Sequence, residues 1–178
     1  MKLYILLTNY PNRLSLFIRR LGGWRFSHVS ISTSSFNCEF FSFTGKRGFI
    51  LEKPLLHPKF KGREIECAFY EIEIPDEIGA ALNEKLKKYA AAPDFYKYSY
   101  FGLMMMYLGV HAHAKNAHTC CSFVTDTLMG ANIFSVKFCR KLINPNDFFI
   151  QFRQYKKFQG PLEKLIERHF KEQARLRE

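Results

Sequence analysis

Residues 117–128 read AHTCCSFVTDTL, and this stretch places two adjacent thiols where a helix begins. Counted from Cys120, one helical face carries apolar or small side chains, at Phe123, Val124, Thr127 and Leu128. Positions i+3, i+4, i+7 and i+8 share a face, so the pattern predicts a helix that packs against a core. Gly130 is expected to end this helix, which then spans residues 120–130.

A thiol at the start of a docked helix is well placed for nucleophilic chemistry. It attacks as a thiolate, and the positive end of the helix dipole stabilises that charge. The first N–H groups of a helix have no acceptor within it, so they can bind an oxyanion that forms on a substrate carbonyl. One such donor has been worth roughly 2.7–4 kcal/mol of barrier. The alternative is that the cysteine is simply a small core residue.

A nucleophilic thiol also needs a general base, and the chain has six histidines. His28 lies in FSHVSIS, residues 26–32, which alternates like a strand and puts His28 on the same side as Ser30. His118 lies two residues before Cys120. The other histidines are His57, His111, His113 and His169. Spacing alone does not choose among them, and a histidine in a strand is often only a hydrogen-bonded polar group.

Outward from residues 120–130, strand and helix patterns follow one another. Apolar patterns predict strands at residues 2–8, 26–32, 38–43, 49–51 and 66–74, with a turn at 45–48. Helical spacing predicts further helices at residues 12–21, 77–92, 98–109 and 161–175. We expect 26–32 and 38–43 to pair as an antiparallel hairpin. The sequence therefore predicts one α+β domain, residues 1–178, with a mostly antiparallel sheet packed against helices.

The charge of the chain restricts its partners. It has 178 residues and a formal net charge of +11, which favours nucleic acid, acidic lipid headgroups or acidic substrates. The same charge also serves solubility. Because no nucleic-acid-reading motif accompanies it, we predict no specific nucleic-acid partner; binding from charge alone would show as a salt-dependent affinity.

The cysteines and the chain start indicate a compartment. Five cysteines form an odd set without framework spacing, and the first nine residues do not read as a secretory signal. No apolar run approaches the ~18 residues that span a bilayer. We expect a cytoplasmic protein. No zinc-ligand spacing is present, so neither a metal nor a cofactor is predicted.

Two short motifs resemble those of a known superfamily. CCSFV, residues 120–124, resembles the C-x-x-F/L-V nucleophile helix of the NlpC/P60 papain-like superfamily, and HVSI, residues 28–31, resembles its histidine strand. The histidine comes first here, as in the circularly permuted branch that includes the YiiX-like proteins and the lecithin:retinol acyltransferase-like enzymes. EFFSFTGKRGF and NPNDF are similar to bacterial members of that branch. The resemblance covers most of residues 2–150 and implies a circularly permuted papain-like fold.

The resemblance also implies a role for each site residue. Cys120 matches the nucleophile, and Cys121 takes a position commonly filled by Ser or Thr, where it supports or packs. His28 matches the general base. The third polar residue of the family lies on the strand after the histidine and orients the imidazole. Glu39 is the candidate for that role and Ser42 is the alternative.

The implied function is a cysteine hydrolase that acts on the acyl group of an amide, an ester or a thioester. Its expected substrate is a small molecule, a peptide or a lipid-like compound. A lipid-directed acyltransferase of the same fold is one alternative, and a binding module with a degraded site is another. A sulfur of Cys120 close to the His28 ring would favour the enzymes.

The amphipathic helix expected at residues 161–175 suits packing on the domain, contact with a second copy, or an anionic membrane surface. The residues predict no oligomeric state.

Overall fold

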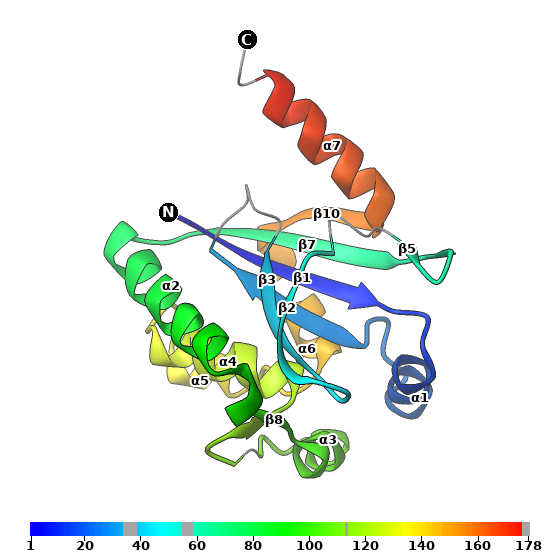
Figure 1. The fold of residues 1–178 in the computed structure, drawn as a ribbon, viewed down its shortest axis with the longest axis vertical. Coiled ribbons are helices and arrows are strands. Elements are labelled where there is room, and N and C mark those ends of the chain that lie inside the picture. Colours follow the sequence, from blue (N-terminus) through cyan, green and yellow to red (C-terminus); the bar gives the residue numbers. More distant parts are fainter. Residues whose placement is uncertain (34–38, 55–58, 113, 176–178) are drawn as a thin grey trace.

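The computed structural model describes residues 1–33, 39–54, 59–112 and 114–175 (Figure 1). Its strands are β1 (Lys2–Asn9), β2 (His28–Ser32), β3 (Phe40–Thr44), β4 (Gly48–Glu52), β5 (Lys59–Phe60), β6 (Arg63–Glu64), β7 (Glu66–Glu73), β8 (Lys97–Tyr98), β9 (Ala117–His118) and β10 (Lys156–Pro161). Its helices are α1 (Arg13–Gly22), α2 (Asp76–Ala91), α3 (Tyr100–Tyr107), α4 (Cys120–Gly130), α5 (Val136–Cys139), α6 (Pro145–Gln151) and α7 (Leu162–Arg175), with short 3-10 turns η1 (Pro93–Phe95) and η2 (Arg153–Tyr155).

A six-stranded sheet forms the centre of the fold, in the order β10-β7-β1-β2-β3-β4. Neighbouring strands in this sheet pair antiparallel. The predicted hairpin of β2 and β3 is confirmed, with Ile31 opposite Phe41. Besides this sheet, the described residues form an antiparallel pair, β5 with β6, and a parallel pair, β8 with β9. The prediction of an α+β chain with a mostly antiparallel sheet is thus confirmed.

Alternation along β1 gives the sheet two apolar faces. Leu3, Ile5 and Leu7 lie in the larger core, whereas Tyr4 and Leu6 lie in a smaller core on the opposite face. All five are buried. Because β1 lies inside the sheet and is covered on both faces, its sequence is a continuous apolar run rather than an apolar–polar alternation.

The larger core lies between the sheet and a layer of helices that contains α2, α4, α5 and α6 (Figure 1). Helix α4 begins at Cys120, as predicted, and ends at Gly130. The face predicted to enter the core is completely or almost completely buried: Phe123, Val124, Thr127 and Leu128. In the described part of the chain, no helix combines the length and apolar character needed to cross a membrane.

The smaller core lies on the other face of the sheet, beneath the start of α7. Leu162 and Leu165 of α7 pack there with Tyr4 and Leu6. Strand β10 leads into α7 and pairs with β7 at one edge of the sheet. The sequence did not predict β10, because KKFQGP lacks apolar alternation and contains Gly and Pro.

Helix α1 forms as predicted but buries little of its apolar face. Asn12 caps its start by accepting a hydrogen bond from the backbone N–H of Ser15 at 2.8 Å. Ile18 is buried, whereas Leu14, Phe17 and Leu21 are exposed. The helical spacing of these residues therefore reflects an amphipathic helix whose apolar side lies largely in solvent.

Candidate active site

A capped first turn holds Cys120 at the start of α4. The Thr119 hydroxyl accepts a hydrogen bond from the backbone N–H of Ser122 at 3.1 Å, and the Ser122 hydroxyl accepts one from the backbone N–H of Thr119 at 2.9 Å. This capping box satisfies two backbone donors. The amides of Cys120 and Cys121 occupy the first two helical positions and have no acceptor within the helix. They are donors from which an oxyanion site can be built.

The imidazole of the candidate site comes from the first residue of β2. His28 lies opposite Thr8 in the ladder with β1, and both residues are buried. Its Nε2 atom is 3.0 Å from Oε1 of Glu52, the last residue of β4. Both side chains are largely shielded from water, with exposed fractions of 8% and 12%. Glu52 is therefore the carboxylate that can orient the ring.

The register of the sheet puts these two side chains on the same face. Ile31 opposes Phe41, and Phe40 opposes Glu52. Because side chains alternate along a strand, Glu52 shares a face of the sheet with Phe40 and His28. Strand β3 separates β2 from β4, so the contact also requires a curled sheet. Figure 1 shows β3 running steeply across β1 and β2.

Glu39, the carboxylate we expected beside His28, lies elsewhere. Its Oε1 atom is 3.0 Å from Nζ of Lys53. The β3–β4 register, continued by one residue beyond the Phe40–Glu52 pair, brings Glu39 opposite Lys53. Because side chains alternate along a strand, Glu39 and Lys53 then point to the face of the sheet opposite to that of His28. Ser42, the alternative, donates a hydrogen bond to the carbonyl oxygen of Val29 at 2.6 Å. The structure thus brings Glu52, and neither of the two expected residues, to the imidazole.

Cys120 and His28 lie close enough that each favours the charged form of the other and so shifts its pKa. Burial alone would lower the pKa of His28, but the Glu52 carboxylate and Cys120 together raise this pKa to about 10. The pKa of Cys120 is held well below its ordinary value, first by the Cys121 thiol and also by His28, against the effect of burial. Since Nε2 of His28 is bound to Glu52, Nδ1 is left for the sulfur. The arrangement favours a thiolate–imidazolium pair at neutral pH.

Cys121 supports this pair as a neutral thiol. Its sulfur lies 4.0 Å from that of Cys120, and its side chain is fully buried. Burial, and then the hydrogen bond and charge of Cys120, raise the pKa of Cys121 well above its ordinary value. Cys121 therefore keeps its proton and can donate it in a hydrogen bond to the Cys120 thiolate.

Two tyrosines that the sequence did not single out border the site. The hydroxyl of Tyr10 donates a long hydrogen bond, 3.5 Å, to Oε2 of Glu52, and its ring centroid is 5.6 Å from that of His28. Burial, and then the Glu52 charge, raise the pKa of Tyr10. On the other side, burial raises the pKa of Tyr98, and the charges of Cys120 and Cys121 raise it further. Both phenols therefore stay neutral beside the site.

The other histidines lie apart from this contact or outside the described residues. His118 Nδ1 is 3.5 Å from Oδ2 of Asp126, and its ring packs against Phe43 at a centroid distance of 5.3 Å. His111 is partly buried in the loop after α3. His57, His113 and the side chain of His169 fall outside what the structure describes. Over the described residues, no group of three or more His, Cys, Asp or Glu side chains is placed to hold a metal ion.

Comparison of the chain with protein-family models, with curated proteins and with solved structures gives no significant match.

Proposed function

We propose that this chain is a cysteine hydrolase that acts through Cys120, His28 and Glu52. It breaks the bond that joins an acyl carbon to the nitrogen of an amide, the oxygen of an ester or the sulfur of a thioester. One observation carries the proposal: the Glu52 carboxylate lies 3.0 Å from Nε2 of His28, and Cys120, buried at the start of α4, interacts with the same ring. This is the order nucleophile, base and orienting carboxylate. A circularly permuted papain-like fold belongs to the same proposal, and the docked nucleophile helix and antiparallel sheet support it.

The first half of the reaction transfers the acyl group to sulfur. The Cys120 thiolate adds to the carbonyl carbon, and the carbonyl π electrons move to oxygen. The free amides of the first turn of α4 donate hydrogen bonds to this oxyanion. When the intermediate collapses, the bond to the leaving amine, alcohol or thiol breaks. The leaving group takes the proton of the His28 imidazolium, and a thioester remains on Cys120.

The second half releases the acid. Neutral His28 takes a proton from water while the water oxygen adds to the thioester carbon. Collapse of the second tetrahedral intermediate expels the Cys120 thiolate, so the pair of thiolate and imidazolium is restored. The Glu52 side chain holds Nε2 of the ring in both halves of the reaction, while Tyr10 donates to its second oxygen.

The test is the site and fate of an acyl group. The chain is incubated with a p-nitrophenyl ester, nitrophenol release is followed, and the trapped acyl adduct is mapped by mass spectrometry. We expect the adduct on Cys120, loss of both signals in Cys120→Ala, and a strongly slowed release in His28→Ala.

Cys139→Ala is the matched control, because Cys139 is also a buried thiol but its pKa is raised by burial. This variant should retain both signals. Undiminished release and acylation in Cys120→Ala would rule out the assignment. Stable acylation of Cys120 without turnover would favour a module that has lost hydrolysis.

A further inference from the structure

Two helices beside the candidate site present large apolar side chains to solvent. Phe17 and Leu21 project from α1, Phe101 and Met104 project from α3, and Leu108 follows directly after α3; each is more than half exposed, from 55% to 68%. Each set recurs at helical spacing, so each helix carries its own apolar stripe. Exposed apolar groups on this scale mark an interaction site rather than scattered surface residues.

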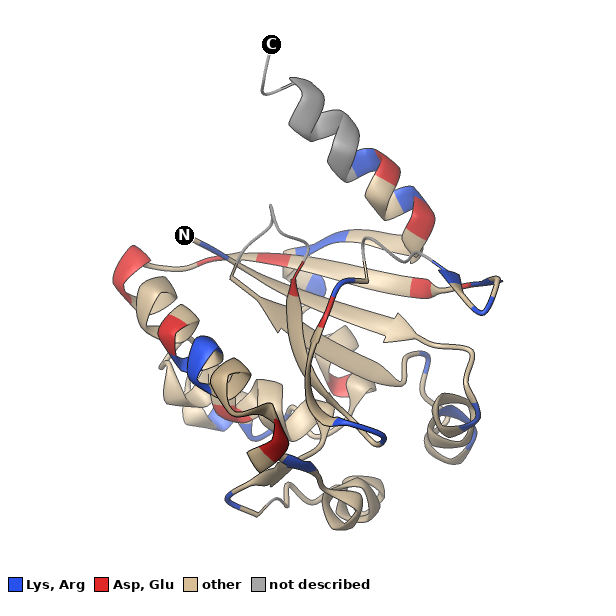
Figure 2. Ribbon diagram, in the orientation of Figure 1, with Lys and Arg blue, Asp and Glu red and all other residues tan. Residues whose placement is uncertain are grey.

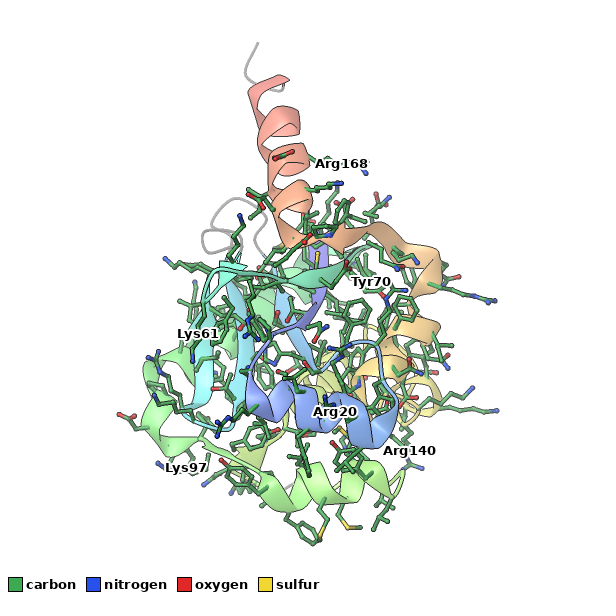
Figure 3. The ribbon with its side chains drawn as sticks, turned by 90° about the vertical axis from the view of Figure 1, so that its right-hand side faces the viewer. Arg20, Lys61, Tyr70, Lys97, Arg140 and Arg168 are labelled. Carbon is green, nitrogen blue, oxygen red and sulfur yellow. The ribbon has the colours of Figure 1, made fainter. Side chains whose placement is uncertain are left out.

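The two stripes belong to one surface because α1 and α3 are packed side by side (Figure 3). The hydroxyl of Tyr107 on α3 donates to the carbonyl oxygen of Ile18 on α1 at 3.2 Å, and its ring stacks on Trp24 at 5.0 Å. The hydroxyl of Tyr100 donates to the carbonyl oxygen of Gly45 at 2.7 Å, which joins the β3–β4 turn to the same surface. We call the exposed side chains of α1, α3 and this turn the α1–α3 surface.

Cations border the apolar stripes, and acidic residues are missing from the segments that carry them. Arg13 and Arg20 on α1, Lys46 and Arg47 in the turn, and Lys97 before α3 are all exposed. The sequence has no Asp or Glu at residues 1–38 or at residues 95–125. Figure 2 shows α3 without any charged residue and α1 with positive residues alone. The α1–α3 surface is therefore apolar, with a purely cationic border.

We infer that the α1–α3 surface docks on an anionic lipid membrane. Apolar side chains of this kind enter the boundary between headgroups and acyl chains, while the bordering Arg and Lys contact anionic headgroups. A second copy fits less well, because a symmetric contact would bring like charges together. A nucleic acid would use the cations but would leave aliphatic side chains such as Leu21 and Leu108 uncovered.

This docking would place the candidate site next to the bilayer. Helix α1 begins shortly after Tyr10, which contacts Glu52, and α3 begins shortly after Tyr98, which lies beside the two thiols. The inference itself does not rest on the hydrolase chemistry, since membrane binding is a property of the α1–α3 surface alone.

The experiment is co-sedimentation of the full chain with vesicles. We expect the chain to pellet with vesicles of phosphatidylcholine and phosphatidylserine, to stay in solution with phosphatidylcholine alone, and to be released by added salt, which screens the cations. Cys120→Ala should bind like the unchanged chain, so failure of the proposed chemistry would leave this test intact.

Two sets of variants locate the contact. Phe17→Ser and Phe101→Ser each remove one apolar group and should weaken binding several-fold, whereas Val136→Ser, at a position on α5 that is 49% exposed, should not. Arg20→Gln/Lys46→Gln/Arg47→Gln should weaken binding by at least ~10-fold. Its control, Lys156→Gln/Lys157→Gln/Lys164→Gln, removes the same charge from β10 and α7, which lie at the opposite end of the molecule from α3 (Figure 1).

Several results would overturn the inference. One is a chain that does not pellet with phosphatidylserine vesicles. Another is an equal loss of vesicle binding in the two charge variants, which would mean that net charge or α7 carries the binding. Unchanged binding of Phe17→Ser and Phe101→Ser would also contradict it. Concentration-dependent self-association that Phe17→Ser abolishes would assign the surface to a second copy instead. Circular dichroism of each variant confirms that it is folded.

Discussion

His28 and Glu52 meet at 3.0 Å although β3 lies between the strands that carry them. Adjacent strands are roughly 4.8 Å apart, so a flat sheet would hold these two strands at about twice that distance. The curl of the sheet brings both side chains inward on one face, where burial strengthens their interaction. The orienting carboxylate is therefore supplied by the shape of the sheet as much as by its sequence.

Glu52→Gln should impair the site far more than its small structural change suggests. The amide cannot stabilise the imidazolium, so the pKa of His28 falls and the thiolate form of Cys120 becomes less populated. We expect ester hydrolysis to fall on the order of 10²–10⁴-fold. The measurement is kcat/KM at neutral pH, together with the rate of alkylation by iodoacetamide.

Glu39→Gln is the matched control for that change. Its carboxylate pairs with Lys53 at a partly exposed position, an interaction worth about 0–1 kcal/mol. Hydrolysis should stay within about twofold of the unchanged chain, which corresponds to a difference of about 0.4 kcal/mol or less in the barrier. Equal losses in the two variants would mean that Glu52 has no special role.

The pH dependence of the site follows from the two shifted pKa values. Because the pKa of Cys120 is held well below its ordinary value, its alkylation rate should be flat through neutral pH and fall only at acid pH. Hydrolysis should also fall as pH rises through about 10, where His28 loses the proton that the leaving group needs. An alkylation rate that rises about tenfold per pH unit through neutrality would indicate an ordinary thiol.

The same shift links His28 to stability. The folded-state pKa of about 10 lies above the ordinary value of 6.5, so the protonated His28 ring contributes stability that is fully present below pH 6.5. This contribution is lost as pH rises through about 10. In His28→Ala the urea midpoint should therefore show a weaker decline over that alkaline range, compared with the unchanged chain.

Cys121 is expected to act on the ionisation of its neighbour. Cys121→Ala removes the thiol that stabilises the Cys120 thiolate, so the midpoint of the alkylation profile should move to higher pH. Cys121→Ser keeps a donor and should move it less. A midpoint that is the same in all three chains would reduce Cys121 to a packing role.

The cap of α4 should be worth about 0.5–2 kcal/mol of stability. Thr119→Ala removes the acceptor for the Ser122 amide at 3.1 Å and loosens the first turn, so both the urea midpoint and the reactivity of Cys120 should fall. Ser135→Ala, which uncaps the short and exposed α5, should cost less. Thr119→Ala with an unchanged midpoint would show that the tertiary packing of α4 makes its cap unnecessary.

Gly48 and Gly62 offer a test of close backbone packing. Both have a φ of +73°, but a Cβ atom on Gly48 would lie 2.2 Å from the Tyr96 carbonyl oxygen, whereas one on Gly62 meets nothing within 4 Å. Ala at Gly62 should cost about 1–2 kcal/mol from backbone strain alone. Ala at Gly48 should cost a further ~1–3 kcal/mol for the clash. Urea unfolding of the two variants measures the difference between their free energies of unfolding. This difference should vanish if β4 and η1 can move apart to make room for the added Cβ atom.

The parts of the fold that the sequence predicted are those with strong apolar periodicity. The bounds of helix α4 agree with the prediction because the apolar face counted from Cys120 and the stop at Gly130 point to the same segment. Strand β10 was missed because an edge strand needs little apolar alternation. For α1, spacing predicted a helix but not which side would face the core, since that depends on what packs against it.

The carboxylate of the site was missed for a reason of register. The predicted strand at residues 49–51 ends one residue before Glu52, and Glu39 was expected because the resemblance puts the third polar residue on the strand after His28. The predicted turn at 45–48 held the missing signal: counting outward from it pairs Phe40 with Glu52 and directs Glu39 to the other face. No comparable signal marked Tyr10, whose role depends on the curl of the sheet.

The late position of α4 in the chain has a consequence for biosynthesis. His28, Glu52 and their strands leave the ribosome well before Cys120, and the sulfur meets these two side chains only when α4 docks on the sheet, whose edge strand β10 follows α4 in the chain. A nascent chain therefore carries at most an ordinary thiol, which is mostly protonated at neutral pH. In the proposed mechanism, the reactivity of Cys120 therefore arises only after the first 130 of the 178 residues, through the end of α4, have been made.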